Sequence, residues 1–154
     1  MLARNSTPPC SAKLNEFLCF ALYSANLAFG RAYRPILDKV GLTYTQYVTM
    51  VALSEGNEQT VGELGQKLFL ESNTLTPILK KLEVLGLIER RRDSADERQV
   101  RVNLTDAGRR LRQQVERSAS KLIDATGLGE ELAGLQQTVS TLRDNLLRST
   151  EAKS

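Results

Sequence analysis

The sequence predicts a mainly α-helical protein with a small β-wing, a winged helix-turn-helix dimerised through its N- and C-terminal helices. Three patterns predict this fold. Two short amphipathic segments follow each other between residues 60 and 86, and two short strands joined by a charged turn follow between 87 and 104. Long amphipathic segments lie on both sides. We therefore expect a flexible arm over 1–10 and a single domain over 11–154, with the winged helix at about 43–104 and dimerisation helices at about 11–40 and 105–148.

The composition of the chain limits the classes of protein to which it can belong. The 154 residues are 41% hydrophobic, enough for one globular domain with its own core. No apolar run approaches ~18 residues and the first residues do not resemble a signal peptide, so we expect a cytoplasmic protein without a membrane partner. The absence of histidine excludes His-based triads and metal sites, and two cysteines are too few for a structural zinc site. We expect no metal, no cofactor and no enzyme activity.

The charge pattern permits a nucleic-acid partner. The net charge is only +3. The cations nevertheless gather at 80–81, 90–92, 98–101 and 109–117. Clustering of this kind is more informative than the total, although a charge run by itself is more often a solvated face.

A long helix is predicted from about Ser11 to Val40, bent or broken near Gly30 or Pro35. Its apolar stripe consists of Leu14, Phe17, Leu18, Ala21, Leu22, Ala25 and Ala28. Two capping boxes follow, at Thr43–Gln46 and Thr60–Glu63. The first opens a helix to about residue 54, the segment 56–59 is a turn, and the second box opens the first helix of the helix-turn-helix.

The second helix of this pair is expected over 72–85. Ser72 or Thr74 is its candidate N-cap, Pro77 then belongs near the first turn, and Gly86 ends the helix. Its polar face carries Asn73, Thr76, Pro77, Lys80 and Lys81. A small polar end followed by lysines suits insertion into a DNA major groove, with the lysines near phosphates.

The wing is predicted as strands over 87–92 and 99–104 with a polar turn between them. Its five arginines are Arg90, Arg91, Arg92, Arg98 and Arg101. An arginine at the tip of a hairpin can enter a narrow minor groove, where the potential is most negative. Asp96 lies two residues from Arg98 and is expected to hold it in an extended pose.

Two further helices are predicted after the wing. Thr105 caps one that runs to about Ala125, and the last runs from about Glu130 to Leu147, with 149–154 frayed. Its apolar positions are Leu128, Leu132, Leu135, Val139, Leu142 and Leu146. This 4-3-4-3-4 spacing is typical of a coiled-coil seam, which packs either within the chain or, as we expect, in a homodimer. A dimer also brings two recognition helices to successive major grooves.

Several motifs resemble the MarR family of winged-helix repressors. The matching segments are 75–83, 86–90, 96–98 and 104–108. Upstream, the segments 18–23, 33–38 and 42–47 resemble the OhrR branch of that family, whose members sense organic hydroperoxides. These upstream motifs are the more specific part, because MarR-type proteins in general need neither the cysteine nor the tyrosines that they contain.

The resemblance implies that Cys19 is the redox-sensing residue, oxidised by an organic hydroperoxide from thiolate to sulfenic acid. It implies that Tyr33 and Tyr44 of the partner subunit support the thiolate, with Tyr23 as a third nearby tyrosine. Tyr23 is also one helical turn from Cys19 in sequence. The segment 122–128 lacks the second cysteine that some members carry. Oxidised Cys19 would then react with a low-molecular-weight thiol or be over-oxidised, with Cys10 as an alternative partner.

The resemblance also implies a DNA site on the second helix and the wing. Its candidate residues are Ser72, Asn73, Thr74, Thr76, Pro77, Lys80, Lys81, Arg90, Asp96 and Arg98. The predicted function is a transcriptional repressor that leaves a pseudo-palindromic double-stranded operator when Cys19 is oxidised. One alternative is a MarR-type repressor released by a reversible small aromatic ligand, with Cys19 structural. The other is a dimeric protein-interaction module that binds no DNA.

Overall fold

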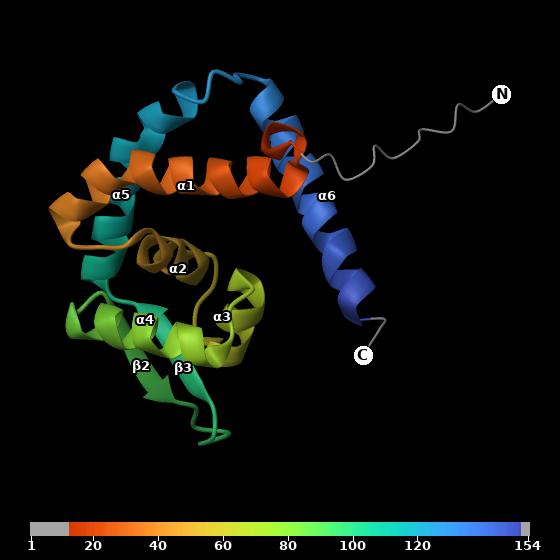
Figure 1. The fold of residues 1–154 in the computed structure, drawn as a ribbon. Helices are drawn as coiled ribbons and strands as arrows, with labels where there is room; N and C mark the ends of the chain where they lie inside the picture. Colours follow the sequence, from red (N-terminus) through yellow and green to blue (C-terminus); the bar gives the residue numbers. More distant parts are fainter. Residues whose placement is uncertain (1–12, 152–154) are drawn as a thin grey trace. The chain divides into compact units, whose positions relative to one another are not determined.

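The structure is a computed structural model that describes residues 13–151. The expected arm over 1–10, with Cys10, lies outside the described residues. The helices are α1 Leu18–Leu37, α2 Tyr44–Ser54, α3 Val61–Leu68, α4 Ser72–Val84, α5 Asp106–Asp124 and α6 Glu131–Glu151 (Figure 1). The strands are β1 Gln59–Thr60, β2 Ile88–Arg92 and β3 Val100–Leu104. The chain divides into two compact units, 1–116 and 117–154. The mainly α class with a small β-wing is confirmed.

The N-terminal helix differs from its prediction. A short 3-10 turn, Leu14–Glu16, precedes α1, and the break falls at Phe17, which has extended backbone angles. From Leu18 to Leu37 the helix is continuous, so no break occurs at Gly30, but the α-helix stops soon after Pro35 and a 3-10 turn, Asp38–Val40, completes the predicted segment. Pro35 lies in the last turn of α1 and has no N–H to donate to the Arg31 carbonyl, so it weakens the helix close to its end.

Both predicted capping boxes are present. The N–H of Gln46 donates to the Thr43 hydroxyl at 3.3 Å, and the N–H of Thr43 donates to the Gln46 side chain at 2.9 Å. The Thr60 and Glu63 pair repeats this pattern with distances of 3.1 and 2.7 Å. These local bonds fix where α2 and α3 begin.

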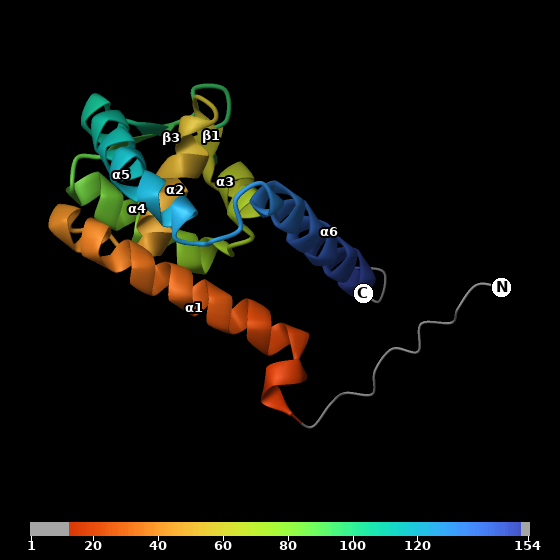
Figure 2. The ribbon, with the colours of Figure 1, turned by 90° about the horizontal axis from the view of Figure 1, so that it is seen from above.

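The wing contains one strand more than predicted. The predicted hairpin forms as β2 and β3, but β1 pairs with the other edge of β3, so the order is β1-β3-β2 and all pairs are antiparallel. Figure 2 labels β1 and β3 side by side. The segment 56–59 was predicted as a turn, and its last residue belongs to β1. A strand of two residues has no alternation by which a sequence pattern can reveal it.

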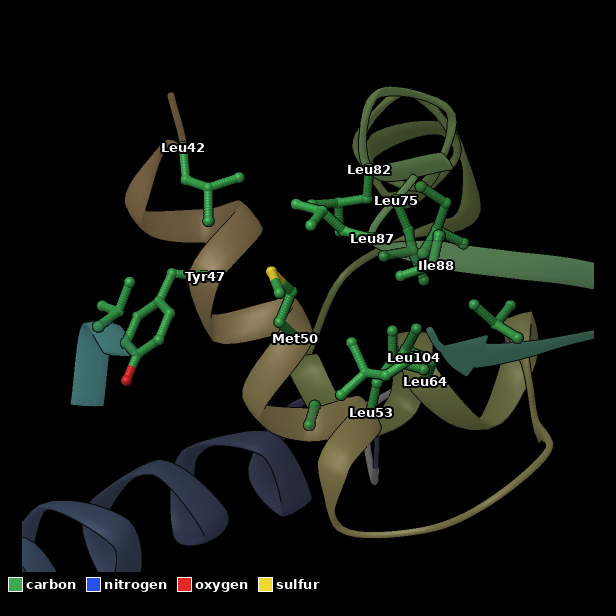
Figure 3. Packing of buried hydrophobic residues seen from close by; sticks show 14 of the residues in the cluster. Leu42, Tyr47, Met50, Leu53, Leu64, Leu75, Leu82, Leu87, Ile88 and Leu104 are labelled. Atoms are coloured by element: carbon green, nitrogen blue, oxygen red, sulfur yellow. The ribbon is translucent and has the colours of Figure 1, made fainter. Parts of the chain in front are cut away.

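One apolar core lies between α2, α3, α4 and the wing. Figure 3 shows side chains of α2 facing those of α3, α4 and the strands. The most deeply buried members include Met50, Leu64, Leu75, Leu82 and Val102, each at 0% exposure. Because α4 and β3 contribute side chains to the same core, α4 and the wing are held in a fixed position relative to each other.

The C-terminal helices begin as predicted, but α6 is longer. The Thr105 hydroxyl accepts the N–H of Gly108 at 3.1 Å and caps α5. Helix α6 continues to Glu151, so the predicted fraying at 149–151 is wrong, and 152–154 lie outside the described residues. Among the helices that the structure describes, none is long and apolar enough to cross a membrane.

Candidate nucleic-acid interface and thiol site

Helix α4 presents its N-terminal end to solvent. The N–H groups of Thr74 and Leu75 both donate to the Glu71 carbonyl at 3.0 Å, so Glu71 is the N-cap residue. The prediction of Ser72 or Thr74 as N-cap is therefore wrong. As a consequence Pro77 lies in the second turn rather than the first, which is a second correction.

The polar face of α4 is free because the opposite face is anchored. Leu75, Leu79 and Leu82 are buried at 0–1% exposure. Exposed or half-buried positions are Ser72, Asn73, Thr74, Thr76, Pro77, Lys80 and Lys81. The helix ends as predicted at Gly86 (φ +70°), where the N–H of Leu87 donates to the Leu82 carbonyl at 3.0 Å. The structure thus brings the predicted residues of this helix together on one surface.

Three of the five wing arginines are neutralised within the chain. Arg90 donates from Nε to Glu83 of α4 at 2.9 Å, and Arg91 donates to Glu89 at 3.1 Å. Arg101 pairs with Asp93, which is 8% exposed. The Arg90 hydrogen bond lowers the pKa of Glu83.

The other two wing arginines remain available. Among the described residues, Arg92 and Arg98 form no ion pair, and both are exposed. Sequence reasoning treated all five as one cationic cluster. It missed this division because the acidic partners Glu83 and Asp93 lie seven and eight residues from their arginines.

Asp96 shapes the tip of the wing differently from the prediction. Its Oδ1 accepts the backbone N–H of Arg98 at 3.1 Å, and its Oδ2 accepts the side-chain amide of Gln99 at 3.3 Å. Asp96 therefore orders the backbone of the tip and does not hold the Arg98 guanidinium. The guanidinium is left free to reach outward.

A surface hollow of about 680 Å³ lies between the start of α3, α4 and the wing. Its polar lining includes Gln66, Thr76, Arg90, Arg98 and Arg101. The hollow draws on three separate segments of the chain, so no single motif indicated it. It borders the same surface on which the polar face of α4 lies.

Cys19 is exposed at the second residue of α1. Its neighbours on this part of the helix are apolar and uncovered in the single chain: Phe17 is 40% exposed, Leu18 58% and Tyr23 59%. Figure 2 shows that the N-terminal half of α1 extends beyond α2, whereas the C-terminal half lies against it. The predicted apolar stripe of this helix therefore has no partner within the described part of unit 1–116.

Two of the three predicted tyrosines lie in a cluster at the other end of α1. The rings of Tyr33 and Tyr44 are 5.1 Å apart, and Tyr47, which was not predicted, lies 5.8 Å from Tyr33. Burial raises the pKa of all three phenols, which are therefore neutral O–H donors at pH 7. Tyr47 follows Tyr44 by three residues on α2, and that helical spacing was the pattern available to find it.

The cluster and Cys19 do not meet within one chain. Fourteen residues of continuous helix separate Cys19 from Tyr33, a rise of about 21 Å. Of the predicted tyrosines, only Tyr23 lies within one turn of the thiol. A contact between Cys19 and the Tyr33–Tyr44 pair requires a second copy of the chain.

Several known proteins are similar to this chain in sequence. The family profile described as transcriptional regulator SarA/Rot matches residues 31–115. The HTH-type transcriptional regulator TtmR of Methylorubrum extorquens (strain PA1) is 44% identical over 134 residues, which cover 86% of this chain and 69% of that protein. The organic hydroperoxide resistance transcriptional regulator of Bacillus subtilis (strain 168) is 39% identical over 142 residues, 87% of this chain and 92% of that protein.

Solved structures share the fold. The crystal structure of AbfR of Staphylococcus epidermidis is 35% identical, with a TM-score of 0.76 over 89% of this chain and 92% of that chain. A structure of reduced AbfR bound to DNA is 38% identical, with a TM-score of 0.67 over 83% and 92%. Wild-type MarR of E. coli, at 22% identity and a TM-score of 0.65 over 84% and 96%, has the same fold.

Proposed function

The chain belongs to the winged-helix transcriptional regulators of the MarR type, and we propose that it represses transcription until an organic hydroperoxide oxidises Cys19. The observation that carries this proposal is the exposed Cys19 thiol on the uncovered apolar end of α1. Cys19 is not part of the apolar core of its own chain, where a structural cysteine would be inert, and the apolar side chains beside it suit a lipophilic oxidant. The relative from B. subtilis is a regulator of organic hydroperoxide resistance. AbfR was solved on DNA in both its reduced and its overoxidised form, and also in a disulfide form, so disulfide formation is the oxidised state that suits release from DNA.

The DNA-binding surface is the polar face of α4 together with the wing. Its N-terminal residues, with small side chains, lie where base edges are read, and Lys80 and Lys81 lie one to two turns further along, in reach of phosphates. Arg98 at the tip of the wing supplies a free cation for the minor groove. AbfR, which shares this fold, was solved bound to DNA, and this supports DNA as the partner.

Two copies of the chain form the functional unit. The uncovered apolar end of α1 and the seam of α6 supply the dimer surface, since Leu135 and Leu146 are 47% and 57% exposed in the single chain. The tyrosine cluster of the partner subunit can then reach Cys19, whereas the cluster of the same chain is too far away. A two-fold axis also makes the operator pseudo-palindromic, with one recognition helix for each half-site.

The sensing reaction balances without a cofactor. The Cys19 thiolate attacks the terminal oxygen of the hydroperoxide, so that an S–O bond forms and the O–O bond breaks; the leaving alkoxide takes a proton from solvent and departs as the alcohol, which leaves a sulfenic acid. Sulfur is oxidised by two electrons and the peroxide is reduced by two. Neutral phenols of Tyr33 and Tyr44 donate hydrogen bonds to the anionic sulfur before the reaction. Oxidation changes the size and charge of the sulfur and disturbs these hydrogen bonds. The distance between the α4 helices of the two subunits then changes, and they no longer match the operator.

The sulfenic acid then condenses with a low-molecular-weight thiol, forming an S–S bond and releasing water, or is over-oxidised. The alternative partner is Cys10, which lies outside the described residues. A Cys10→Ser variant that still forms the same oxidised species on non-reducing gels would exclude Cys10 as the resolving residue.

The proposal is tested by mass spectrometry and by anisotropy of labelled operator DNA. Treatment with cumene hydroperoxide should add oxygen to the peptide that contains Cys19 and weaken DNA binding in step with that modification. Hydrogen peroxide at the same concentration should do so more slowly, because Phe17 and Leu18 favour an apolar oxidant. Modification of Cys19 without any loss of DNA binding would contradict the proposal.

A second function has one observation in its favour. The hollow between α3, α4 and the wing is lined by Arg98, which forms no ion pair among the described residues, and this cation suits a small aromatic carboxylate. In that case the repressor would be released reversibly and Cys19 would be structural. A Cys19→Ser protein that responds to its inducer as the wild type does would favour this alternative.

A further inference from the structure

Two side chains of β3 point away from the core and hold the loop that joins α2 to β1. Arg101 donates from Nη1 to the Glu58 carbonyl at 2.7 Å, and Asn103 Oδ1 accepts the Glu58 N–H at 2.6 Å. Both backbone polar groups of one residue are thus bound by neighbouring side chains of the same strand. Glu58 has φ +54°, an unfavourable conformation for a residue other than glycine. Such a conformation persists where its surroundings hold it.

The same arginine also holds the turn of the wing. From Nε, Arg101 pairs with the Asp93 carboxylate, which also accepts the Ala95 N–H at 2.7 Å. These bonds lower the pKa of Asp93, so the carboxylate is charged at neutral pH. Arg101 therefore joins the turn that leads to the wing tip with the loop beyond the opposite edge of the sheet.

Arg101 lies opposite another arginine across the strands. Arg91 and Arg101 are directly opposite each other on β2 and β3, and like charges at such positions repel. Each is drawn to its own acid, Arg91 to Glu89 and Arg101 to Asp93. Each guanidinium group is therefore neutralised by an acid of its own, and Arg101 alone of the two reaches Glu58.

The loop at Glu58 is in turn fixed to α2. The next residue, Gln59, donates from its side chain to the carbonyls of Ala52 and Leu53 at 3.0 and 3.3 Å, in the last turn of α2. The connection from the turn of the wing to α2 is therefore continuous in hydrogen bonds.

We infer that Arg101 and Asn103 are positioning residues for DNA binding: they lock the wing to the C-terminal end of α2 and do not contact phosphates. This inference rests on the proposed function, in which the wing reaches DNA. It implies that Arg101 contributes to affinity through the placement of Arg98, without releasing counterions of its own.

The test combines hydrogen exchange with DNA binding at several salt concentrations. In Arg101→Ala, Arg101→Lys and Asn103→Ala, exchange should accelerate at residues 56–60 and stay unchanged in α4. Operator affinity should fall about tenfold, with the slope of log K against log salt as in the wild type. Arg101→Lys is decisive because it keeps the positive charge but lacks the planar guanidinium group, which donates to Asp93 and to Glu58 at the same time.

Arg91→Ala is the matched control. It removes one guanidinium from the facing position of the neighbouring strand and leaves the Glu58 contacts intact. If Arg101→Ala flattens the salt slope as Arg98→Ala does, and Arg101→Lys binds as the wild type, Arg101 is a phosphate contact and the inference is overturned. Unchanged exchange at 56–60 would overturn it as well.

Failure of the inference is distinguishable from failure of the proposed function. If Arg98→Ala weakens DNA binding while the Arg101 and Asn103 variants do not, only the positioning role is refuted. If Arg98→Ala and Arg101→Ala both bind the operator as the wild type does, the wing does not reach DNA. That result refutes the positioning role and also the contact between wing and DNA in the proposed function. Thermal unfolding of each variant checks that the protein is folded at the assay temperature.

Discussion

At the scale of single residues, intramolecular acids decide which arginines of the wing are free. Arg90 and Arg91 are bound by Glu83 and Glu89, whereas Arg98 is exposed and unpaired within the described chain. We expect Arg98→Ala to weaken operator binding by about tenfold and to reduce the salt slope by about one, because fewer counterions are released. Arg91→Ala, which removes an already paired charge, should have a smaller effect in the same titration. Equal effects of the two variants would show that the ion pairs do not persist on DNA.

Asp93 makes folding stability depend on pH. Its pKa in the folded protein is lowered, first by the Ala95 N–H and then by Arg101. Stability from this group is thus present above its unfolded pKa, about 3.9, and is lost as the pH falls through the lower folded value. Asp93→Asn should be less stable than the wild type at pH 7, and the difference should shrink towards pH 3. Urea unfolding at both pH values measures this, and a difference that grows on acidification would contradict it.

At the scale of elements, one close approach fixes the start of α5. A Cβ on Gly108 would lie 2.0 Å from the Leu87 carbonyl oxygen, which is backbone and cannot rotate away. We expect Gly108→Ala to destabilise the protein by at least ~3 kcal/mol, through overpacking between α5 and the residue before β2. Gly134→Ala in α6 is the matched control, since its Cβ would meet nothing within 4 Å, and helix propensity should make it neutral or slightly stabilising. Denaturant unfolding measures the stability of both variants. Similar unfolding midpoints would show that a Cβ at position 108 does not clash with the Leu87 carbonyl.

Elements set by neighbouring residues were the predictable ones. The boxes at Thr43 and Thr60 and the stop at Gly86 depend on residues within a turn, and the structure contains them as predicted. Strand β1 was missed because two residues become a strand only when β3 offers its free edge. Of the candidate site, the residue types on α4 were readable in the sequence. The pairing of Arg101 with Asp93 and Glu58, which crosses the fold, was not.

At the scale of the whole molecule, the proposed dimer depends on apolar surface that a single chain leaves uncovered. We expect Leu135→Lys/Leu146→Lys to be monomeric in analytical ultracentrifugation and to bind the operator at least about a hundredfold more weakly, because two half-sites are no longer engaged together. Gln137→Lys, on another face of α6, adds a charge without touching the seam and is the control. A double variant that remains dimeric would move the interface away from α6.

The central claim is that the single thiol at Cys19 controls DNA binding by the whole dimer. The most direct measurement is a gel shift with operator DNA for wild type and Cys19→Ser, before oxidation, after cumene hydroperoxide, and after dithiothreitol. We expect both proteins to bind when reduced, only the wild type to be released by the hydroperoxide, and dithiothreitol to restore its binding. Release of both proteins by the oxidant, or of neither, would contradict it.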